Sequence, residues 1–405
     1  MALPNPSREP IAPPKIVRLG ALEPIQILIL QPTAFCNIDC TYCYLPGRDA
    51  RARMSPAVLE RIADEVLQST IFGKDTLILW HAGEPTAAPV SWYREAYRIL
   101  QSRIDWPLRF QFQTNGTLID EEWVRFFADT GSSVTLSIDG PTALHDAHRV
   151  DRRGKGTHAR VMASARLLKE AGIDFSTITV VTAESLTRAD EIFDFFSALG
   201  VTSAGFSPEE AEGANRQSSL YQQERLAQVE AFFARLTERN LSAARPLRIR
   251  EAEHVLRPLR RGPNAKIQNQ ECALAAMVTI AADGTVAFFS PEHLTTIRED
   301  GSVFAAGNLM SMPFDSMVNS APVAQMEAEI RRGVELCRSS CQYFRFCGGG
   351  APANKYGELG RFDATETWHC RVTKQAAVRG ILAAVGRQSG RPSDPGEPAP
   401  GERRP

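Results

Sequence analysis

The chain of 405 residues is 43% hydrophobic and carries a formal net charge of −1, so it can bury a sizeable core but shows no global signature of nucleic-acid binding. Its length suggests two or three domain-sized units. Apolar runs such as residues 272–278 are too short to span a bilayer, and the N-terminus has no apolar signal-peptide core, so we expect a cytoplasmic protein without a membrane segment. In that reducing compartment, eight cysteines indicate metal or redox chemistry rather than disulfide bonds.

The chain begins with a proline-rich arm, residues 1–20, which we expect to be disordered. From residue 25 to about residue 207, strand-like apolar runs alternate with helical patterns, and this alternation predicts a parallel sheet. The predicted fold class is α/β, a partial TIM-like (β/α)6 barrel whose active site lies at the carboxyl ends of the strands. The expected strands are 25–30, 76–80, 108–114, 133–138, 175–181 and 202–207.

The helices expected between these strands have apolar residues at three- and four-residue spacing. The first begins at Ser55-Pro56, an N-cap followed by proline, and runs to about residue 67; the others are 92–101, 121–129, 158–171 and 188–199. A long amphipathic helix, 217–240, then leaves the barrel. We therefore expect a barrel domain at 21–240, a second domain at 241–385 and a disordered tail at 386–405.

The second domain opens with six arginines between residues 245 and 261. A solvated helical face explains them, although they could also grip an acidic peptide. Residues 276–289 predict two short strands around a turn at Asp283-Gly284.

Three cysteines, Cys36, Cys40 and Cys43, have CxxxCxxC spacing directly after the first predicted strand. Three thiolates on one tight loop can hold three irons of a cubane cluster, which leaves the fourth iron free to bind and reduce a small molecule. Zinc sites pair CxxC with a second, distant pair of ligands. The spacing therefore favours an iron–sulfur cluster over the alternatives, a zinc site or three buried thiols.

Glycine and polar residues follow the next three predicted strands, at the same end of the sheet as the cysteines. Gly83 and Glu84 follow the second strand, Asn115 follows the third, and Ser137 and Asp139 end the fourth. Gly83 would let the backbone approach a ligand closely, and Glu84 could accept hydrogen bonds from a ligand ammonium. Each alone could be an ordinary turn former, but together they indicate a ligand site at one barrel mouth.

The cysteine loop after the first strand and Gly83-Glu84-Pro85 after the second resemble the radical S-adenosylmethionine (SAM) superfamily. The resemblance implies a 4Fe–4S cluster whose open iron binds SAM, and one electron then cleaves SAM to methionine and a 5′-deoxyadenosyl radical. It also implies that Gly83 and Glu84 bind the methionine amino group. The remaining SAM contacts that it implies are Tyr42 near the adenine, Asn115 and Ser137 at the sugar and carboxylate, and Arg149 at the carboxylate.

Arg149 and two nearby histidines have simpler alternative explanations. Arg149 could be an ordinary surface arginine. His145 and His148 could bind a metal, but the chain has no HxxxH helix or HExxH pattern. We expect the two histidines to hydrogen-bond to backbone groups or to Asp146 instead.

A second cysteine group resembles the SPASM domain of peptide-modifying radical enzymes, and its members are Cys337, Cys341, Cys347 and the more distant Cys370. The resemblance implies an auxiliary 4Fe–4S cluster with four thiolate ligands; a structural zinc site is the alternative. A complete SPASM domain holds two auxiliary clusters, but Phe289 and Ala351 stand at two of the extra ligand positions. We therefore expect one auxiliary cluster, two clusters in all, and Cys272 as a buried thiol.

The resemblance also narrows the reaction. Sulfatase maturases carry a catalytic aspartate where this chain has Ser290, so formylglycine formation is not expected. From about residue 20 to 380 the chain looks like the maturases of glycine-rich-repeat peptides, which belong with the cyclophane (triceptide) synthases, in the runs 31–33, 80–85, 112–118, 347–355 and 364–367. This implies a ribosomally made precursor peptide in which an aromatic ring carbon is joined to the Cβ of a residue two positions later. It also implies an electron donor such as flavodoxin or ferredoxin.

Such a crosslink requires a proton acceptor, for which Asp139 is the first candidate; Glu209, Glu210 and Glu292 are candidates by position only. A thioether-forming or epimerising maturase is the rival among enzymes. A non-catalytic, zinc-bound peptide adaptor is the rival from another class. The arm before the first strand is too short for the peptide-recognition domain that some maturases carry there, so we expect leader binding on another surface or chain.

Overall fold

The computed structural model describes residues 24–262, 267, 269–288, 291, 294 and 304–388. The predicted N-terminal arm, the tail from residue 389, and Phe289, Ser290 and Glu292 lie outside the described residues. Within the described ranges, no helix is long and apolar enough to cross a membrane.

One mixed sheet forms the centre of the molecule, with strand order β10-β9-β8-β1-β2-β3-β4-β5-β6-β7. Strands β1 to β7 are parallel, β8 is parallel to β1, and β8, β9 and β10 are joined antiparallel. The strands are β1 Ile27–Leu30, β2 Leu77–Trp80, β3 Arg109–Thr114, β4 Ser133–Ser137, β5 Phe175–Val181, β6 Ser203–Pro208, β7 Arg248–Ile249, β8 Met277–Ile280, β9 Thr285–Ala287 and β10 Gly307–Asn308.

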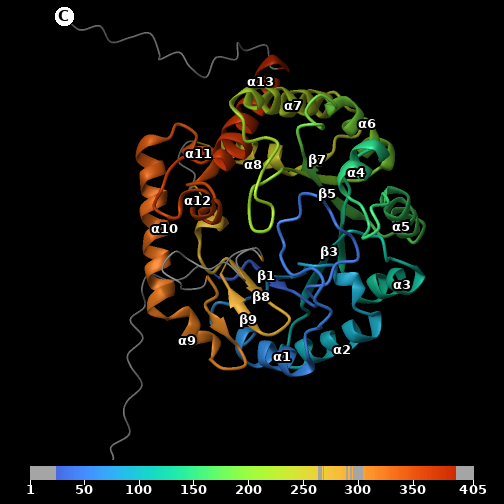
Figure 1. Ribbon diagram of the computed structural model, residues 1–405, viewed down its shortest axis with the longest axis vertical. Helices are drawn as coiled ribbons and strands as arrows, with labels where there is room; N and C mark the ends of the chain where they lie inside the picture. The colour runs from blue at the N-terminus through green and yellow to red at the C-terminus, as the bar shows by residue number, and fades with distance from the viewer. Residues whose placement is uncertain are drawn as a thin grey trace, which may run out of the picture.

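Helices surround the curved sheet, and the blue segment that follows β1 lies over its centre (Figure 1). Local capping sets several helix starts: the Ser55 hydroxyl accepts from the Val58 amide, and Asp120 caps α3. The helices are α1 Pro56–Arg61, α2 Val90–Gln101, α3 Glu121–Thr130, α4 Thr142–His148, α5 His158–Glu170, α6 Ala189–Leu199, α7 Gln223–Leu241, α8 Arg250–Arg261, α9 Phe314–Val318, α10 Ala321–Ser340, α11 Phe344–Cys347, α12 Pro352–Leu359 and α13 Ala377–Gln388.

The predicted fold class is confirmed: the six predicted strands are present, and their ends differ from the predicted ends by at most two residues. The predicted hairpin at 276–289 is also present as β8 and β9. The prediction for α7 was wrong at its start, since the helix begins at Gln223 rather than residue 217. The preceding residues form a loop because the Ser219 amide and hydroxyl both bind the Glu209 carboxylate.

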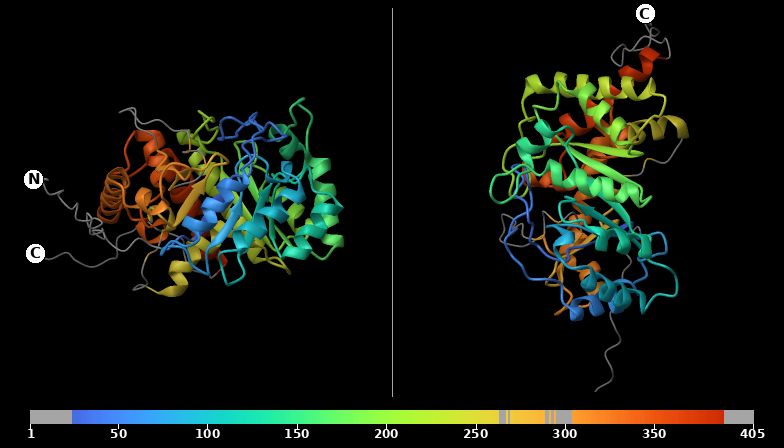
Figure 2. Two further views of the ribbon diagram at one scale, coloured as in Figure 1. Left: turned by 90° about the horizontal axis from the view of Figure 1, so that it is seen from below. Right: turned by 90° about the vertical axis from the view of Figure 1, so that its right-hand side faces the viewer.

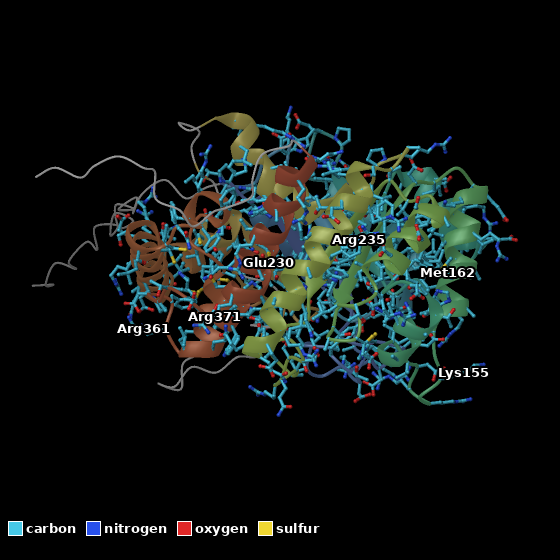
Figure 3. The ribbon with its side chains drawn as sticks, turned by 90° about the horizontal axis from the view of Figure 1, so that it is seen from above. Lys155, Met162, Glu230, Arg235, Arg361 and Arg371 are labelled. Carbon is cyan, nitrogen blue, oxygen red and sulfur yellow. The ribbon has the colours of Figure 1, made fainter. Side chains whose placement is uncertain are left out.

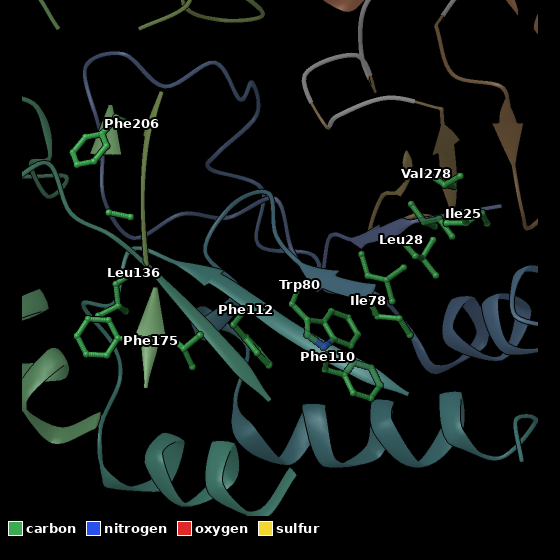
Figure 4. Packing of buried hydrophobic residues seen from close by; sticks show 14 of the residues in the cluster. Ile25, Leu28, Ile78, Trp80, Phe110, Phe112, Leu136, Phe175, Phe206 and Val278 are labelled. Atoms are coloured by element: carbon green, nitrogen blue, oxygen red, sulfur yellow. The ribbon is translucent and has the colours of Figure 1, made fainter. Parts of the chain in front are cut away.

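Side chains alternate along the strands between a core on the outside of the sheet and a cavity on the inside. Trp80 and Phe110 face α2, where Trp80 lies edge-on to Tyr93 and Phe110 stacks on Tyr97 with ring centroids 3.8 Å apart (Figure 4). On the other face of β2, Leu79 lines the cavity. This alternation gives the barrel a dry outer layer and leaves its interior available for ligands.

The C-terminal part of the chain covers one side of the barrel and continues its sheet (Figure 2). Strand β8 pairs with β1 along its whole length, so the sheet runs across the boundary predicted at residue 240. Helix α13 returns to α7, where Arg379 forms a 2.7 Å ion pair with Glu230, and it extends to Gln388, into the region predicted as tail. The second cysteine group is thereby held beside the barrel.

Candidate active site at the barrel mouth

The loop with Cys36, Cys40 and Cys43 leaves β1 and is held from both sides by backbone hydrogen bonds. The Thr41 amide donates to His148 O at 3.0 Å, and the Cys36 amide donates to Arg48 O at 3.0 Å. All three thiols are half-buried. Burial, together with nearby Glu84, raises the pKa of Cys36 to about 12, and burial raises that of Cys40 to about 11. Thiols of this kind become ligands by losing a proton to solvent as the metal binds.

The local backbone packing requires glycine at position 83 even without a ligand. Its backbone has φ +79°, and a Cβ at this position would lie 2.4 Å from Thr33 O and 2.8 Å from both Ala34 O and Phe35 O. The preceding Ala82 also has a positive φ, of 68°. The loop after β2 therefore packs directly on the backbone that leads into the cysteine loop, and only glycine fits there.

Glu84 is buried at 1% exposure and accepts four hydrogen bonds. One oxygen accepts from the Thr86 amide, the Thr86 hydroxyl and the Thr114 hydroxyl, and the other accepts from the Asn115 amide at 2.8 Å. Burial raises the pKa of Glu84, while these donors oppose that shift. The carboxylate is thus fixed between the ends of β2 and β3, where it forms part of the cavity wall.

Asn115 and Ser137 lie at the ends of β3 and β4, on the same cavity wall as the cysteine loop. The Asn115 side-chain amide donates to Asn37 Oδ1 at 2.9 Å and lies 3.8 Å from Cys36 Sγ. Both residues therefore lie at the barrel mouth with the cysteine loop, and their contacts with SAM stay a prediction.

Tyr42, Asp139 and Arg149 form one buried network. Arg149 is only 6% exposed, so the surface alternative for it is wrong. Its guanidinium donates to both Asp139 oxygens at 3.0 and 3.1 Å, and its Nη1 lies 4.0 Å from Cys40 Sγ. The same carboxylate also accepts from the Tyr42 hydroxyl and from the Val180 amide. Asp139 thus holds Arg149 and Tyr42 in place beside the cysteine loop.

His145 makes the predicted hydrogen bond to a backbone group, whereas His148 differs from the prediction because its partner is a side-chain hydroxyl. His145 receives the Asp139 amide at 3.4 Å on Nδ1 and pairs through Nε2 with the Thr157 hydroxyl at 2.9 Å. His148 pairs with the Thr41 hydroxyl at 2.8 Å. His145 therefore orients the strand end that carries Asp139.

The second cysteine group converges at the end of α10. Cys337 lies in the last turn of this helix and Cys341 is its C-cap. Cys347 ends α11, and Cys370 begins the π-helix Cys370–Ala376 after α12. Burial raises the pKa of Cys370 to about 11, and the other three thiols raise it further because they lie nearby. Within the described ranges, no three His, Cys, Asp or Glu side chains are placed as ligands of one ion. The thiolate ligands of a cubane cluster each bind a different iron, so they need not converge on one point.

Cys272 differs from its prediction as a buried thiol, because it is half-buried. It ends the short 3₁₀ turn Gln270–Cys272 on the cavity wall, where its Sγ lies 3.4 Å from Gly350 O and receives the Asn269 side chain at 3.3 Å. Its neighbour Ala351 is buried and carries no ligand atom, as the sequence indicates.

One cavity of about 1220 Å³ reaches from the first cysteine loop to the second cysteine group. Its wall includes Cys36, Cys40 and Cys43 and, from the second cysteine group, Cys347. The loop between β6 and α7 reaches towards the centre and contributes Glu210 and Glu212 to its wall (Figure 1).

The acidic wall brings together residues from distant segments. Asn354 of α12 donates to Glu210 at 3.0 Å and to Glu212 at 3.4 Å, and His369 Nδ1 lies 3.5 Å from Glu210. Burial and the neighbouring Glu210 raise the pKa of Glu212 well above its usual range. Sequence reasoning named Glu210 by position only and missed Glu212, because nothing in the local sequence indicates that α12 packs on this loop.

Comparisons with known proteins identify the barrel. A family model described as the Radical SAM superfamily matches residues 30–196. The uncharacterized protein sll1766 of Synechocystis sp. is 34% identical over 388 residues, which cover 94% of this chain and 96% of that protein. The serine-type anaerobic sulfatase-maturating enzyme of Klebsiella aerogenes is 34% identical over 196 residues. That match covers 47% of this chain and 48% of the enzyme, so the similarity is confined to about half of each.

Two solved structures share the fold. The structure of anSMEcpe with bound AdoMet and Kp18Cys peptide matches with a TM-score of 0.73 and 21% identity, covering 90% of this chain and 98% of that chain. Streptococcus suis SuiB bound to precursor peptide SuiA matches with a TM-score of 0.63 and 16% identity, covering 86% and 76%. The matched family model begins at the end of β1 and includes the cysteine loop at the barrel mouth. Residues 30–196 therefore form a radical SAM domain, of the family whose members use SAM and a 4Fe–4S cluster.

Proposed function

We propose that the protein is a peptide maturase that joins an aromatic ring carbon to the Cβ of a residue two positions later in a ribosomally made precursor peptide. The observation that carries this proposal is the large cavity, which Cys36, Cys40 and Cys43 line together with Cys347 of the second cysteine group. Peptide complexes of SuiB and anSMEcpe support a peptide substrate for this fold. The volume of about 1220 Å³ exceeds that of most small-ligand sites and leaves room for a peptide segment beside SAM.

Different residues at the barrel mouth would bind the first cluster and the separate parts of SAM. Cys36, Cys40 and Cys43 would hold the first cluster, and the loop with Gly83 and Glu84 would hold the amino group of SAM. When bound, these groups supply a 5′-deoxyadenosyl radical that removes a hydrogen atom from a peptide carbon. Arg149, fixed by Asp139, would orient the SAM carboxylate, and Tyr42 on the same network would lie against the adenine.

Forming the crosslink breaks one Cβ–H bond and one aromatic C–H bond and makes one C–C bond. The peptide gives up one hydrogen atom to the deoxyadenosyl carbon, and then one electron and one proton. The second cysteine group would hold an auxiliary 4Fe–4S cluster as electron acceptor, since a cluster with four thiolate ligands has no open iron and is suited to electron transfer.

Glu210 is our proposed proton acceptor. Asp139 and Glu209 are less suited, because Asp139 accepts from four donors and the Glu209 carboxylate is held by Ser219. Glu210 lines the cavity at the centre of the acidic wall, so its carboxylate is placed to receive a proton from a peptide bound there. We expect Glu210→Gln to lower the yield of crosslinked peptide about a hundredfold while 5′-deoxyadenosine still forms.

The test uses reconstituted protein, reductant, SAM and a glycine-rich peptide with repeated aromatic residues, with products analysed by mass spectrometry. A C–C crosslink predicts loss of two hydrogens, with the linkage located on an aromatic residue and a residue two positions on. A thioether would also lose two hydrogens but would consume a peptide cysteine, and an epimer would lose none. Formylglycine on a sulfatase peptide would instead favour the activity named for the Klebsiella relative.

A further inference from the structure

Lys355 lies buried beside the second cysteine group. It is 3% exposed, and its Nζ lies 3.4 Å from Cys337 Sγ and 3.4 Å from Gly333 O. Among the described residues, no carboxylate forms an ion pair with it. An ammonium removed from water is costly unless an opposite charge lies close by. The two neighbours that the structure gives it, a thiol and a carbonyl, do not supply that charge while the thiol is protonated.

A second lysine near the same cysteines, Lys374, has its charge compensated in the usual way, by a carboxylate. Lys374 forms an ion pair with Glu271 at 3.4 Å, so its charge is compensated by the protein. Lys355 has no such carboxylate within the described ranges, although it is the more buried of the two. Among the described residues, the cysteine group is therefore the nearest source of a compensating charge for Lys355.

The position of Lys355 is set by helix packing rather than by a flexible loop. It lies on α12, where its amide donates to Ala351 O at 3.1 Å, and its side chain reaches α10 at the turn that carries Gly333 and Cys337. Both α10 and α12 are regular helices, and Cys337 is itself only 6% exposed. The lysine is thus held against one particular sulfur.

We propose that Lys355 is the counter-ion of an auxiliary 4Fe–4S cluster on the second cysteine group and raises its reduction potential through a charge-assisted hydrogen bond to the Cys337 sulfur. Such a cluster is anionic and gains a further negative charge on reduction, so a buried cation stabilises the reduced form more than the oxidised form. A higher potential makes the cluster a better electron acceptor. The inference rests on the proposed function only in requiring a cluster at this site.

The experiment measures the midpoint potential of this cluster by anaerobic redox titration with electron paramagnetic resonance. A full-length background with Cys36, Cys40 and Cys43 changed to alanine removes the other cluster, so the signal has one source and no turnover is needed. We expect Lys355→Met to shift the potential to a more negative value, and Lys355→Arg, which keeps the charge, to lie closer to the parent protein. Lys155→Met is the control, because Lys155 is an exposed lysine far from the second cysteine group. Figure 3 shows it at the opposite end of the molecule from Arg361 and Arg371, which lie in the same C-terminal part of the chain as that group.

Iron analysis of each variant separates the outcomes. If Lys355→Met loses the cluster, Lys355→Gln, which keeps a hydrogen-bond donor without the charge, is titrated in its place. A full complement of iron with an unchanged potential would overturn the role of Lys355 and leave the proposed function intact. A parent protein with no iron at this site would overturn both.

Discussion

At the scale of single residues, the barrel mouth is built from buried polar groups that hold one another in place before any ligand binds. Asp139 accepts from Arg149, Tyr42 and the Val180 amide, while Glu84 accepts from two threonines and a backbone amide. Such pre-organisation reduces the entropy that a ligand must lose on binding. Removing one partner leaves another polar group buried without compensation, which makes these residues sensitive to substitution.

Asp139→Asn tests the buried pair. It removes the charge that compensates Arg149 at 3.0 Å, so we expect the free energy of unfolding to fall by about 3 kcal/mol in urea denaturation. Glu191→Gln is the matched control, because the Arg188–Glu191 pair is largely exposed and should change stability by less than about 1 kcal/mol. Equal effects of the two substitutions would show that burial does not strengthen the Asp139–Arg149 interaction.

Gly83→Ala tests the packing of the β2 loop on the cysteine loop. The added methyl would meet three backbone oxygens at 2.4 to 2.8 Å, so we expect the variant to be destabilised and to bind less iron at the first cysteine group. Gly172→Ala is the control, since Gly172 has a similar φ of +69° but nothing within 4 Å, and should cost only about 1 kcal/mol. Normal iron content in Gly83→Ala would contradict the packing argument.

The sequence predicted this site well where the motif is local and poorly where it depends on distant segments. Cys36, Glu84 and Asn115 follow strands whose positions the apolar pattern indicates, and parallel strands must bring those positions together. Lys355 and Glu212 could not be predicted in the same way. Each acquires its partner only when α12 packs against α10 and against the loop after β6, and no periodicity in the sequence encodes those contacts.

At the scale of elements, the second cysteine group is positioned by helices that return to the barrel. Strand β8 extends the sheet beside β1, and α13 packs on α7 through Arg379 and Glu230. The alternation of strands and helices predicted the barrel. It did not predict the pairing of β8 with β1 or the packing of α13 on α7, because the sequence of a strand or a surface helix does not specify its distant partner. The cavity that joins the two cysteine groups depends on both contacts.

Gly380→Ala tests the contact between α13 and α7. A Cβ at this position would lie 2.2 Å from Glu230 O, so α13 must shift away from α7. We expect a lower melting temperature and less iron at the second cysteine group, whose Cys370 leads directly into α13. Gly357→Ala in α12 serves as the control, because nothing lies within 4 Å and alanine favours the helix. A melting temperature of Gly380→Ala equal to that of the control would argue against close packing here.

At the scale of the whole molecule, stability should fall on mild acidification. Burial lowers the pKa of His145 from 6.5 to about 3. The nearby Arg149 and His158 lower it further, while Asp139 opposes the shift. The unfolded chain therefore binds a proton more readily than the folded one, and the stability that His145 contributes above pH 6.5 is lost as the pH falls towards 3.

We expect this group to account for about 1 kcal/mol of lost stability between about pH 7.5 and about pH 6, and His145→Gln to reduce that slope. Anaerobic urea denaturation at both pH values measures it. The same pH slope in the variant and the parent protein would mean that His145 does not titrate in this way.

The central claim is that one cavity joins a radical-generating cluster to an auxiliary cluster, and iron content together with 5′-deoxyadenosine production tests it most directly. After anaerobic reconstitution, the parent protein should contain iron and sulfide for two cubane clusters. Changing Cys337 and Cys341 to alanine should remove one cluster but still allow 5′-deoxyadenosine to form from SAM and reductant. Changing Cys36, Cys40 and Cys43 should remove the other cluster and abolish that product. Zinc in place of iron, with no 5′-deoxyadenosine from the parent protein, would contradict the account.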